Sequence, residues 1–167
     1  GDGLDANGSI EMSGGTVIVD GPTDGGNGAL DYDATFNISG GLLIASGSNA
    51  MLQTPSSSSS QNTIVVSSNT SSHTLINIQD STGTDLITYA PSKSSQVIMI
   101  SSPEFKTGET YTISTGGTST GTEIDGLYKG GSYSGGSNVA TLTISSSITS
   151  NGNLNNGMGG PGGMGRP

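Results

Sequence analysis

Apolar and polar residues alternate in short runs along most of this 167-residue chain. A period of two is typical of β-strands with one buried face, and Gly, Ser and Asn residues that favour turns separate the runs. No segment keeps a helical period or an apolar run of about 18 residues, the length that would indicate a membrane-spanning helix. We therefore expect an all-β fold without a membrane span.

The first 47 residues contain one pattern twice, with 26 residues between Asp5 and Asp31 and again between Ser13 and Ser39. The first copy reads GLDANGSIEMSGGTVIVDG and the second reads ALDYDATFNISGGLLIASG. Each copy has three pairs of apolar positions, which predict three short strands joined by Gly-containing corners. Repeats of this length are typical of stacked architectures, so we expect two coils of a short parallel β-helix. An antiparallel meander with accidental similarity is the alternative.

The pattern divides the chain into four parts. These are β-helix coils at 1–52, a Ser-rich loop at 53–61, a β-rich region at 62–149 and a Gly/Met/Pro tail at 150–167. The Ser-rich loop is expected to be a linker, with a hydroxyl-rich surface edge as the alternative. The tail has no core-forming residues of its own, so order in it would require a contact with its own domain or a neighbouring subunit.

The β-rich region has a strand pattern of its own. Strands are predicted at 63–66, 74–78, 86–89, 96–100, 110–114 and 139–144. They favour a small antiparallel sheet or sandwich that continues or caps the β-helix, with further coils as the alternative. The Gly-rich residues 115–136 are expected to form a long connecting loop.

Composition narrows the class of protein. The net charge is −9 and no Lys or Arg precedes Lys93, so nucleic acid or an anionic membrane is a poor partner. The absence of cysteine permits any compartment. A surface rich in Ser, Thr, Asn and Gly, and a start in mid-motif at Gly1, favour a processed piece of a secreted bacterial precursor at an extracellular or cell-surface location.

Acidic residues are concentrated at the start of the chain, where seven of the 13 lie within the first 33 residues. Alternation directs several of them outward on one face, and coil stacking brings Asp31 over Asp5. Like charges at this spacing are destabilising without a cation, and Ca²⁺ binds carboxylate and amide oxygens. The predicted Ca²⁺ ligands are Asp5, Asn7, Asp31 and Asp33, with Asp2 and Asp24 as further candidates. A solvated acidic stripe is the alternative.

Residues for catalysis are scarce. The single histidine, His73, lies beside two serines, but an exposed residue at the start of a strand explains it better than a catalytic triad. All Lys and Arg residues lie outside the repeats, so no base is expected near the Ca²⁺ and we predict no enzyme activity. Tyr128 and Tyr133, flanked by glycines, are candidates for stacking on sugar rings. The alternative is that they anchor a flexible loop.

Three phrases carry a resemblance to a known family: GDGLDANGSIEMSGGTVIVDGPTDGGNGALDYD, MLQTPSSSSSQ and GTEIDGLYKGGSYSGG. Over residues 1–147 the chain is similar to the secreted bacterial carbohydrate-binding domain-containing family. The resemblance implies a right-handed, Ca²⁺-binding parallel β-helix like that of polysaccharide lyases, and binding to cellulose and polygalacturonate. It places Asp2, Asp5, Asn7, Asp31 and Asp33 in the metal-binding coils.

The expected function is that of a non-catalytic, extracellular, Ca²⁺-binding protein that binds polysaccharide, either cellulose or a pectin-like glycan. The alternative is a self-assembling structural subunit of an extracellular filament or surface array. It rests on the open coil edge near Gly1, which would expose unpaired backbone groups that identical subunits can cover by stacking or by exchange of a strand or tail. A polysaccharide lyase is the third reading, and the lack of a base argues against it.

Overall fold

The computed structural model describes residues 1–152, which form strands, turns and loops. The all-β prediction is confirmed for these residues, and none of them belongs to a helix that could cross a membrane. The predicted Gly/Met/Pro tail lies outside the described residues from residue 153 onward.

The strands form three sheets. The smallest sheet pairs β1 (Leu4–Ala6) with β3 (Leu30–Tyr32). The five-stranded sheet has, in spatial order, β13 (Ile148–Ser150), β5 (Thr63–Thr70), β8 (Ser95–Ser101), β4 (Phe36–Gly47) and β2 (Ile10–Asp20). The six-stranded sheet has β10 (Thr122–Ile124), β11 (Leu127–Lys129), β7 (Asp85–Tyr89), β6 (Ile76–Gln79), β9 (Thr110–Ser119) and β12 (Tyr133–Thr143).

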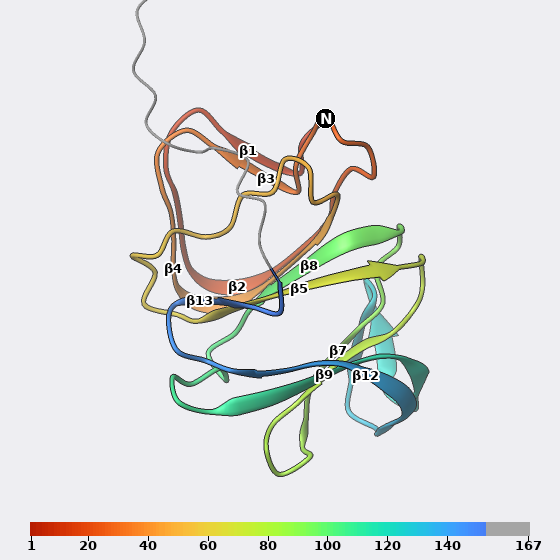
Figure 1. Cartoon of the computed structure of the whole chain (residues 1–167). Helices are drawn as coiled ribbons and strands as arrows, with labels where there is room; N and C mark the ends of the chain where they lie inside the picture. Colours follow the sequence, from red (N-terminus) through yellow and green to blue (C-terminus); the bar gives the residue numbers. More distant parts are fainter. Residues whose placement is uncertain (153–167) are drawn as a thin grey trace, which may run out of the picture.

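The five-stranded sheet is the middle of three layers, with the β1–β3 side of the windings above it and the six-stranded sheet below (Figure 1). Alternation along β4 sends Ile44 into the lower core and Leu43 and Ala45 into the upper core. Strands β5 and β8 divide their side chains in the same way. Burial on both faces explains why these three strands contain continuous apolar runs.

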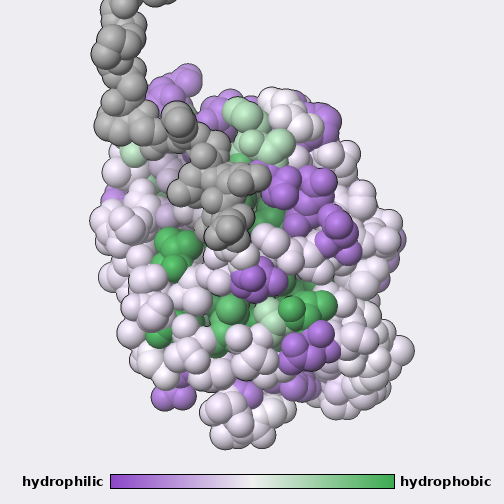
Figure 2. All heavy atoms as spheres, in the orientation of Figure 1, coloured by the Kyte–Doolittle hydropathy of each residue, from purple (hydrophilic) through white to green (hydrophobic). Residues whose placement is uncertain are grey.

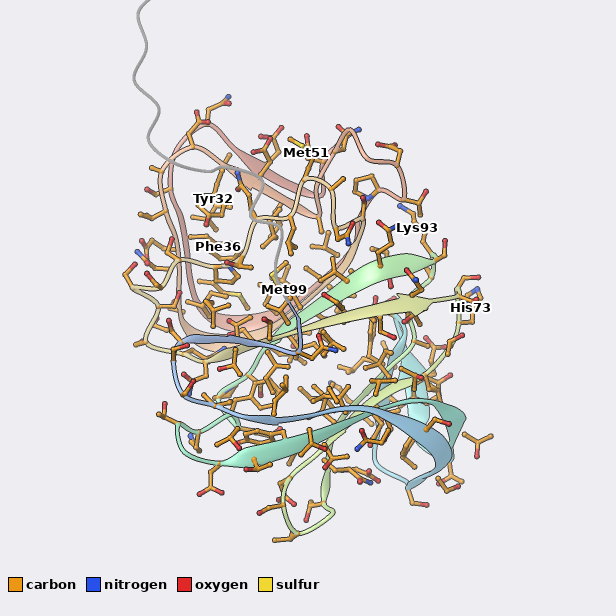
Figure 3. All side chains as sticks on the ribbon, viewed as in Figure 1. Tyr32, Phe36, Met51, His73, Lys93 and Met99 are labelled. Carbon is orange, nitrogen blue, oxygen red and sulfur yellow. The ribbon has the colours of Figure 1, made fainter. Side chains whose placement is uncertain are left out.

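The two copies of the repeat stack in parallel with the predicted offset. Leu4 pairs with Leu30 and Ile10 with Phe36, each 26 residues on. Side chains of the second copy, including those of Tyr32 and Phe36, lie inside the winding (Figure 3). However, the second and third strands predicted in each copy form one continuous strand, β2 or β4.

A complete parallel β-helix is not shown by this arrangement. The next strand beside β4 is β8, which runs antiparallel, and β5 then pairs antiparallel with β8. The parallel stack therefore comprises two windings, after which strands of the β-rich region complete the same sheet.

Glycines at the corner of the second winding allow close backbone contact with the first. A Cβ on Gly40 would lie 2.5 Å from the carbonyl oxygen of Ser13, closer than real Cβ atoms approach. The equivalent glycine in the first winding, Gly14, has nothing within 4 Å of such a Cβ. Glycine is therefore required for packing at position 40, whereas at position 14 there is space for a larger side chain.

The Ser-rich segment packs along β4. The Ser56 N–H donates to the Phe36 carbonyl at 2.8 Å, and the Phe36 N–H donates to Ser56 Oγ at 2.9 Å. The Ile38 N–H donates to Ser59 Oγ at 3.1 Å. Serine hydroxyls thus satisfy backbone groups of β4 that an adjacent strand would otherwise satisfy.

The prediction of a long loop at 115–136 is wrong. Strand β9 continues to Ser119, β12 begins at Tyr133, and the β10–β11 hairpin lies between them. Glycines with positive φ, among them Gly116 and Gly135, allow the paired strands to bend within this segment. The antiparallel sheet expected for the β-rich region is confirmed, but it includes these additional strands.

Asp20, at the end of β2, joins the two large sheets. Its carboxylate accepts hydrogen bonds from the Tyr89 hydroxyl on β7, from Ser46 Oγ at 3.0 Å and from the Ser92 N–H at 3.0 Å. Lys93 Nζ donates to the Asp20 carbonyl oxygen at 2.8 Å. A lysine distant in sequence therefore lies beside the repeats.

Candidate glycan-binding cleft and acidic stripe

The acidic stripe has the predicted stacking. Asp5 pairs with Asp31 across the parallel β1–β3 ladder, and the side chains of Asp5, Asp31 and Asp33 are exposed. The Asp33 N–H donates to the Ala6 carbonyl at 3.2 Å, which extends the ladder beyond β3. Carboxylates from successive windings therefore lie one strand spacing apart.

Electrostatic repulsion is evident in the stripe. Desolvation, followed by the negative charges of Asp2, Asp5 and Asp33, raises the pKa of Asp31 above its usual value. A cation near Asp31 would offset this repulsion. The donor set of carboxylates and the Asn7 amide fits a hard divalent cation, but within residues 1–152 no three acidic or histidine side chains are grouped closely enough to hold a metal ion.

The two further candidate ligands have partners in the fold. Asp2 Oδ1 accepts a hydrogen bond of 2.7 Å from the Gly28 N–H, which ties the two windings together. Asp24 Oδ1 accepts from the Gly26 N–H at 3.0 Å and from Asn27 Nδ2 at 3.3 Å. Asp24 therefore stabilises its own turn, and the charges that raise the Asp31 pKa do not include it.

Both predicted tyrosines line one cleft of about 540 Å³, a volume in the range typical of small-ligand sites. Its apolar side chains come from three strands: Leu42 of β4, Leu86 and Ile87 of β7, and Leu127 of β11. Polar residues at the cleft include Ser102, Ser119 and Ser132. On the face drawn in Figure 2, hydrophobic residues reach the surface in separate spots among more polar residues.

A tight hairpin positions Tyr128. Asp125 and Gly126 both have positive φ, 52° and 79°, as a two-residue type I′ turn requires. The turn pairs β10 with β11, and Tyr128 then lies opposite Thr88 of β7. The Asp-Gly dipeptide is a strong hairpin signal, so the local sequence does indicate this hairpin within the Gly-rich segment.

Tyr133 is fixed at both its backbone and its side chain. Its N–H donates to Asp85 Oδ2 at 3.0 Å, and its hydroxyl donates to the Gly116 carbonyl at 2.8 Å. Tyr133 therefore anchors the bent β9–β12 hairpin and is also one of the residues that line the cleft. The ligand-binding and anchoring interpretations are compatible at this residue.

Asp85 is a charged residue of the cleft that the sequence does not predict. Desolvation opposes its ionisation, but hydrogen bonds from Gln79, the Tyr133 N–H and Asn77 outweigh it and lower the pKa of Asp85. The carboxylate lines the cleft and is negatively charged at neutral pH. No local motif indicates it, because its partners come from β6 and β12.

His73 is exposed and precedes β6, as expected. Its φ of 61° places it in a turn, where its N–H donates to the Pro91 carbonyl at 2.7 Å. The described residues give its side chain no hydrogen bond to a serine.

Comparisons with protein-family models, with curated proteins and with solved structures found no match for this chain.

Proposed function

We propose that this protein binds polysaccharide without catalysis, through the cleft that contains Tyr128 and Tyr133. The supporting observation is that the fold brings both tyrosines to one cleft with apolar side chains and a hydroxyl-rich rim. Sugar rings have apolar faces that pack on aromatic rings and hydroxyls that need hydrogen-bond partners. The proposed ligand is either cellulose or a pectin-like glycan such as polygalacturonate, and the proposed setting is extracellular or at the cell surface.

Retention on insoluble cellulose and on polygalacturonate tests this function. We expect Tyr128→Ala to lower the retained fraction severalfold, because a ring contact contributes about 0.5–1.5 kcal/mol. Tyr128→Phe should retain most of the binding. Met51→Ala is the matched control, because Met51 is 51% exposed and lies away from the cleft, beside the windings (Figure 3). Equal retention of Tyr128→Ala and wild type would refute this site.

We also propose that the two windings are a section of a right-handed parallel β-helix and that their acidic stripe binds Ca²⁺. Asp5, Asn7, Asp31 and Asp33 would hold the ion, and the raised pKa of Asp31 supports a cation there. Bound Ca²⁺ would neutralise the repulsion between the windings. Isothermal titration with CaCl₂ tests the site, and a binding stoichiometry below one would contradict it.

A second candidate function is that of a structural subunit that assembles through β2. Among the described strands only β4 pairs with β2, so one edge of this strand has free backbone groups. The open space around Gly14 would accept a further winding, as Gly40 accepts the first. Electron microscopy of the purified protein tests assembly, and monodisperse single particles at high concentration would exclude it.

A further inference from the structure

A second cleft continues the first across β11. It has a volume of about 840 Å³ and is lined by residues of β2, of the β10–β11 hairpin and of the segments around His73 and Ser92. Leu127, Tyr128 and Lys129 line both clefts. Strand β11 is therefore a shared wall between two hollows, with Tyr128 at their junction.

The opposite wall is also continuous. Leu42 lines the first cleft and Thr16 lines the second, and these residues are direct partners in the parallel ladder between β4 and β2. Neighbouring strands lie about 4.8 Å apart. The two hollows thus adjoin along both walls, between the β2–β4 edge and the β10–β11 hairpin, and are together called the groove.

Each hollow alone has a volume in the range of about 300–1,000 Å³ that is typical of sites for one small molecule. The two hollows together therefore offer more volume than one small ligand needs. The second hollow adds an apolar surface of its own, the side chain of Ile124, which is 56% exposed. An elongated ligand can therefore contact Ile124 in the second hollow and the residues of β11 that line both hollows.

Charge in the groove selects against anions. Its carboxylates are Asp85 and Glu104 in the first cleft and Asp20, Glu123 and Asp125 in the second. Lys129 is the only Lys or Arg among the described residues that line either cleft. Like charges repel each other, so the carboxylates of a polyuronate chain would be repelled by the carboxylates that line the groove. A neutral glycan could instead use these carboxylates as hydrogen-bond acceptors.

We propose that the groove binds a neutral glycan chain of several sugar units, which lies across Tyr128 and occupies both clefts. The proposal rests on the proposed polysaccharide-binding function and adds to it the extent and the charge class of the ligand.

Titration calorimetry of the full chain with soluble oligosaccharides, in EDTA and at physiological salt, tests the proposal. The probes are the disaccharides and hexasaccharides of the cellulose, xylan and mannan series, with oligogalacturonates of the same lengths. We expect the affinity for one neutral series to rise at least about tenfold from disaccharide to hexasaccharide. Oligogalacturonates should bind at least about tenfold more weakly than that hexasaccharide.

Variants separate the extended groove from a single cleft. Ile124→Ser changes an exposed side chain that lines only the second cleft, and it should weaken hexasaccharide binding severalfold and flatten the length dependence. Met51→Ala should bind like wild type. Equal affinity for disaccharide and hexasaccharide, tighter binding of galacturonates, or no effect of Ile124→Ser would overturn this inference while leaving the glycan-binding function intact. Failure of every glycan to bind would refute the function itself and this inference with it.

Discussion

The Asp20 carboxylate offers a direct test of how the two large sheets are held together. It accepts the hydroxyl hydrogen of Tyr89, a residue that is 0% exposed. Asp20→Ala removes this acceptor and leaves the hydroxyl buried without a partner, at a cost of about 1–3 kcal/mol. The bonds from Ser46 and the Ser92 N–H to the same carboxylate are also lost. We therefore expect Asp20→Ala to lower the free energy of unfolding by about 3 kcal/mol.

Tyr89→Phe removes the hydroxyl and keeps the ring, so its expected cost is smaller, about 1.5 kcal/mol. The double variant lacks both the Asp20 carboxylate and the Tyr89 hydroxyl, so it leaves no buried hydroxyl without its acceptor. The summed costs of the single variants should therefore exceed the cost of the double variant by about 1–2 kcal/mol, the range seen for residues in one hydrogen-bond network.

Urea unfolding followed by circular dichroism measures all three variants with wild type. Glu109→Gln is the charge control, because it also removes one negative charge but its exposed side chain makes no hydrogen bond with the described residues. A coupling energy near zero, or an Asp20→Ala variant as stable as Glu109→Gln, would refute the view that this carboxylate connects the sheets.

Three further predictions concern the repeat and the acidic residues. Gly40→Ala should destabilise the fold by more than about 1 kcal/mol in urea unfolding, because its Cβ has no space, whereas Gly14→Ala should be neutral; equal effects would contradict the stacking. Hydrogen bonds lower the pKa of Asp85 below 3.8, so its stabilising contribution is present above about pH 3.8 and is lost as pH falls through its folded-state pKa. Asp85→Asn should therefore weaken the dependence of the melting temperature on pH below about pH 3.8. The same pH dependence in Asp85→Asn and wild type would contradict a stabilising role of the Asp85 carboxylate. EDTA should lower the melting temperature of wild type but not of Asp31→Asn, since the ion stabilises only a folded state that binds it; an EDTA shift of equal size in both would exclude Asp31 as a ligand.

The stripe and the cleft differ in how far the sequence predicts them. Asp5 and Asp31 are paired by a repeat that can be read from the chain, since parallel windings of equal length must bring equivalent positions together. The cleft contains two tyrosines that the sequence suggested, but their companions Leu42 and Asp85 come from distant strands. Their proximity depends on how the sheets pack, which periodicity does not encode.

The sequence by itself determined the all-β class and the 26-residue offset of β1–β3 and β2–β4. These features follow from local alternation and an internal repeat. Only the tertiary structure decided that β8 lies antiparallel between β4 and β5, and that residues 115–136 contain β10, β11 and the ends of β9 and β12. The physical reason is that strand pairing partners are chosen by long-range burial and backbone hydrogen bonding, and many partners are compatible with one alternating pattern.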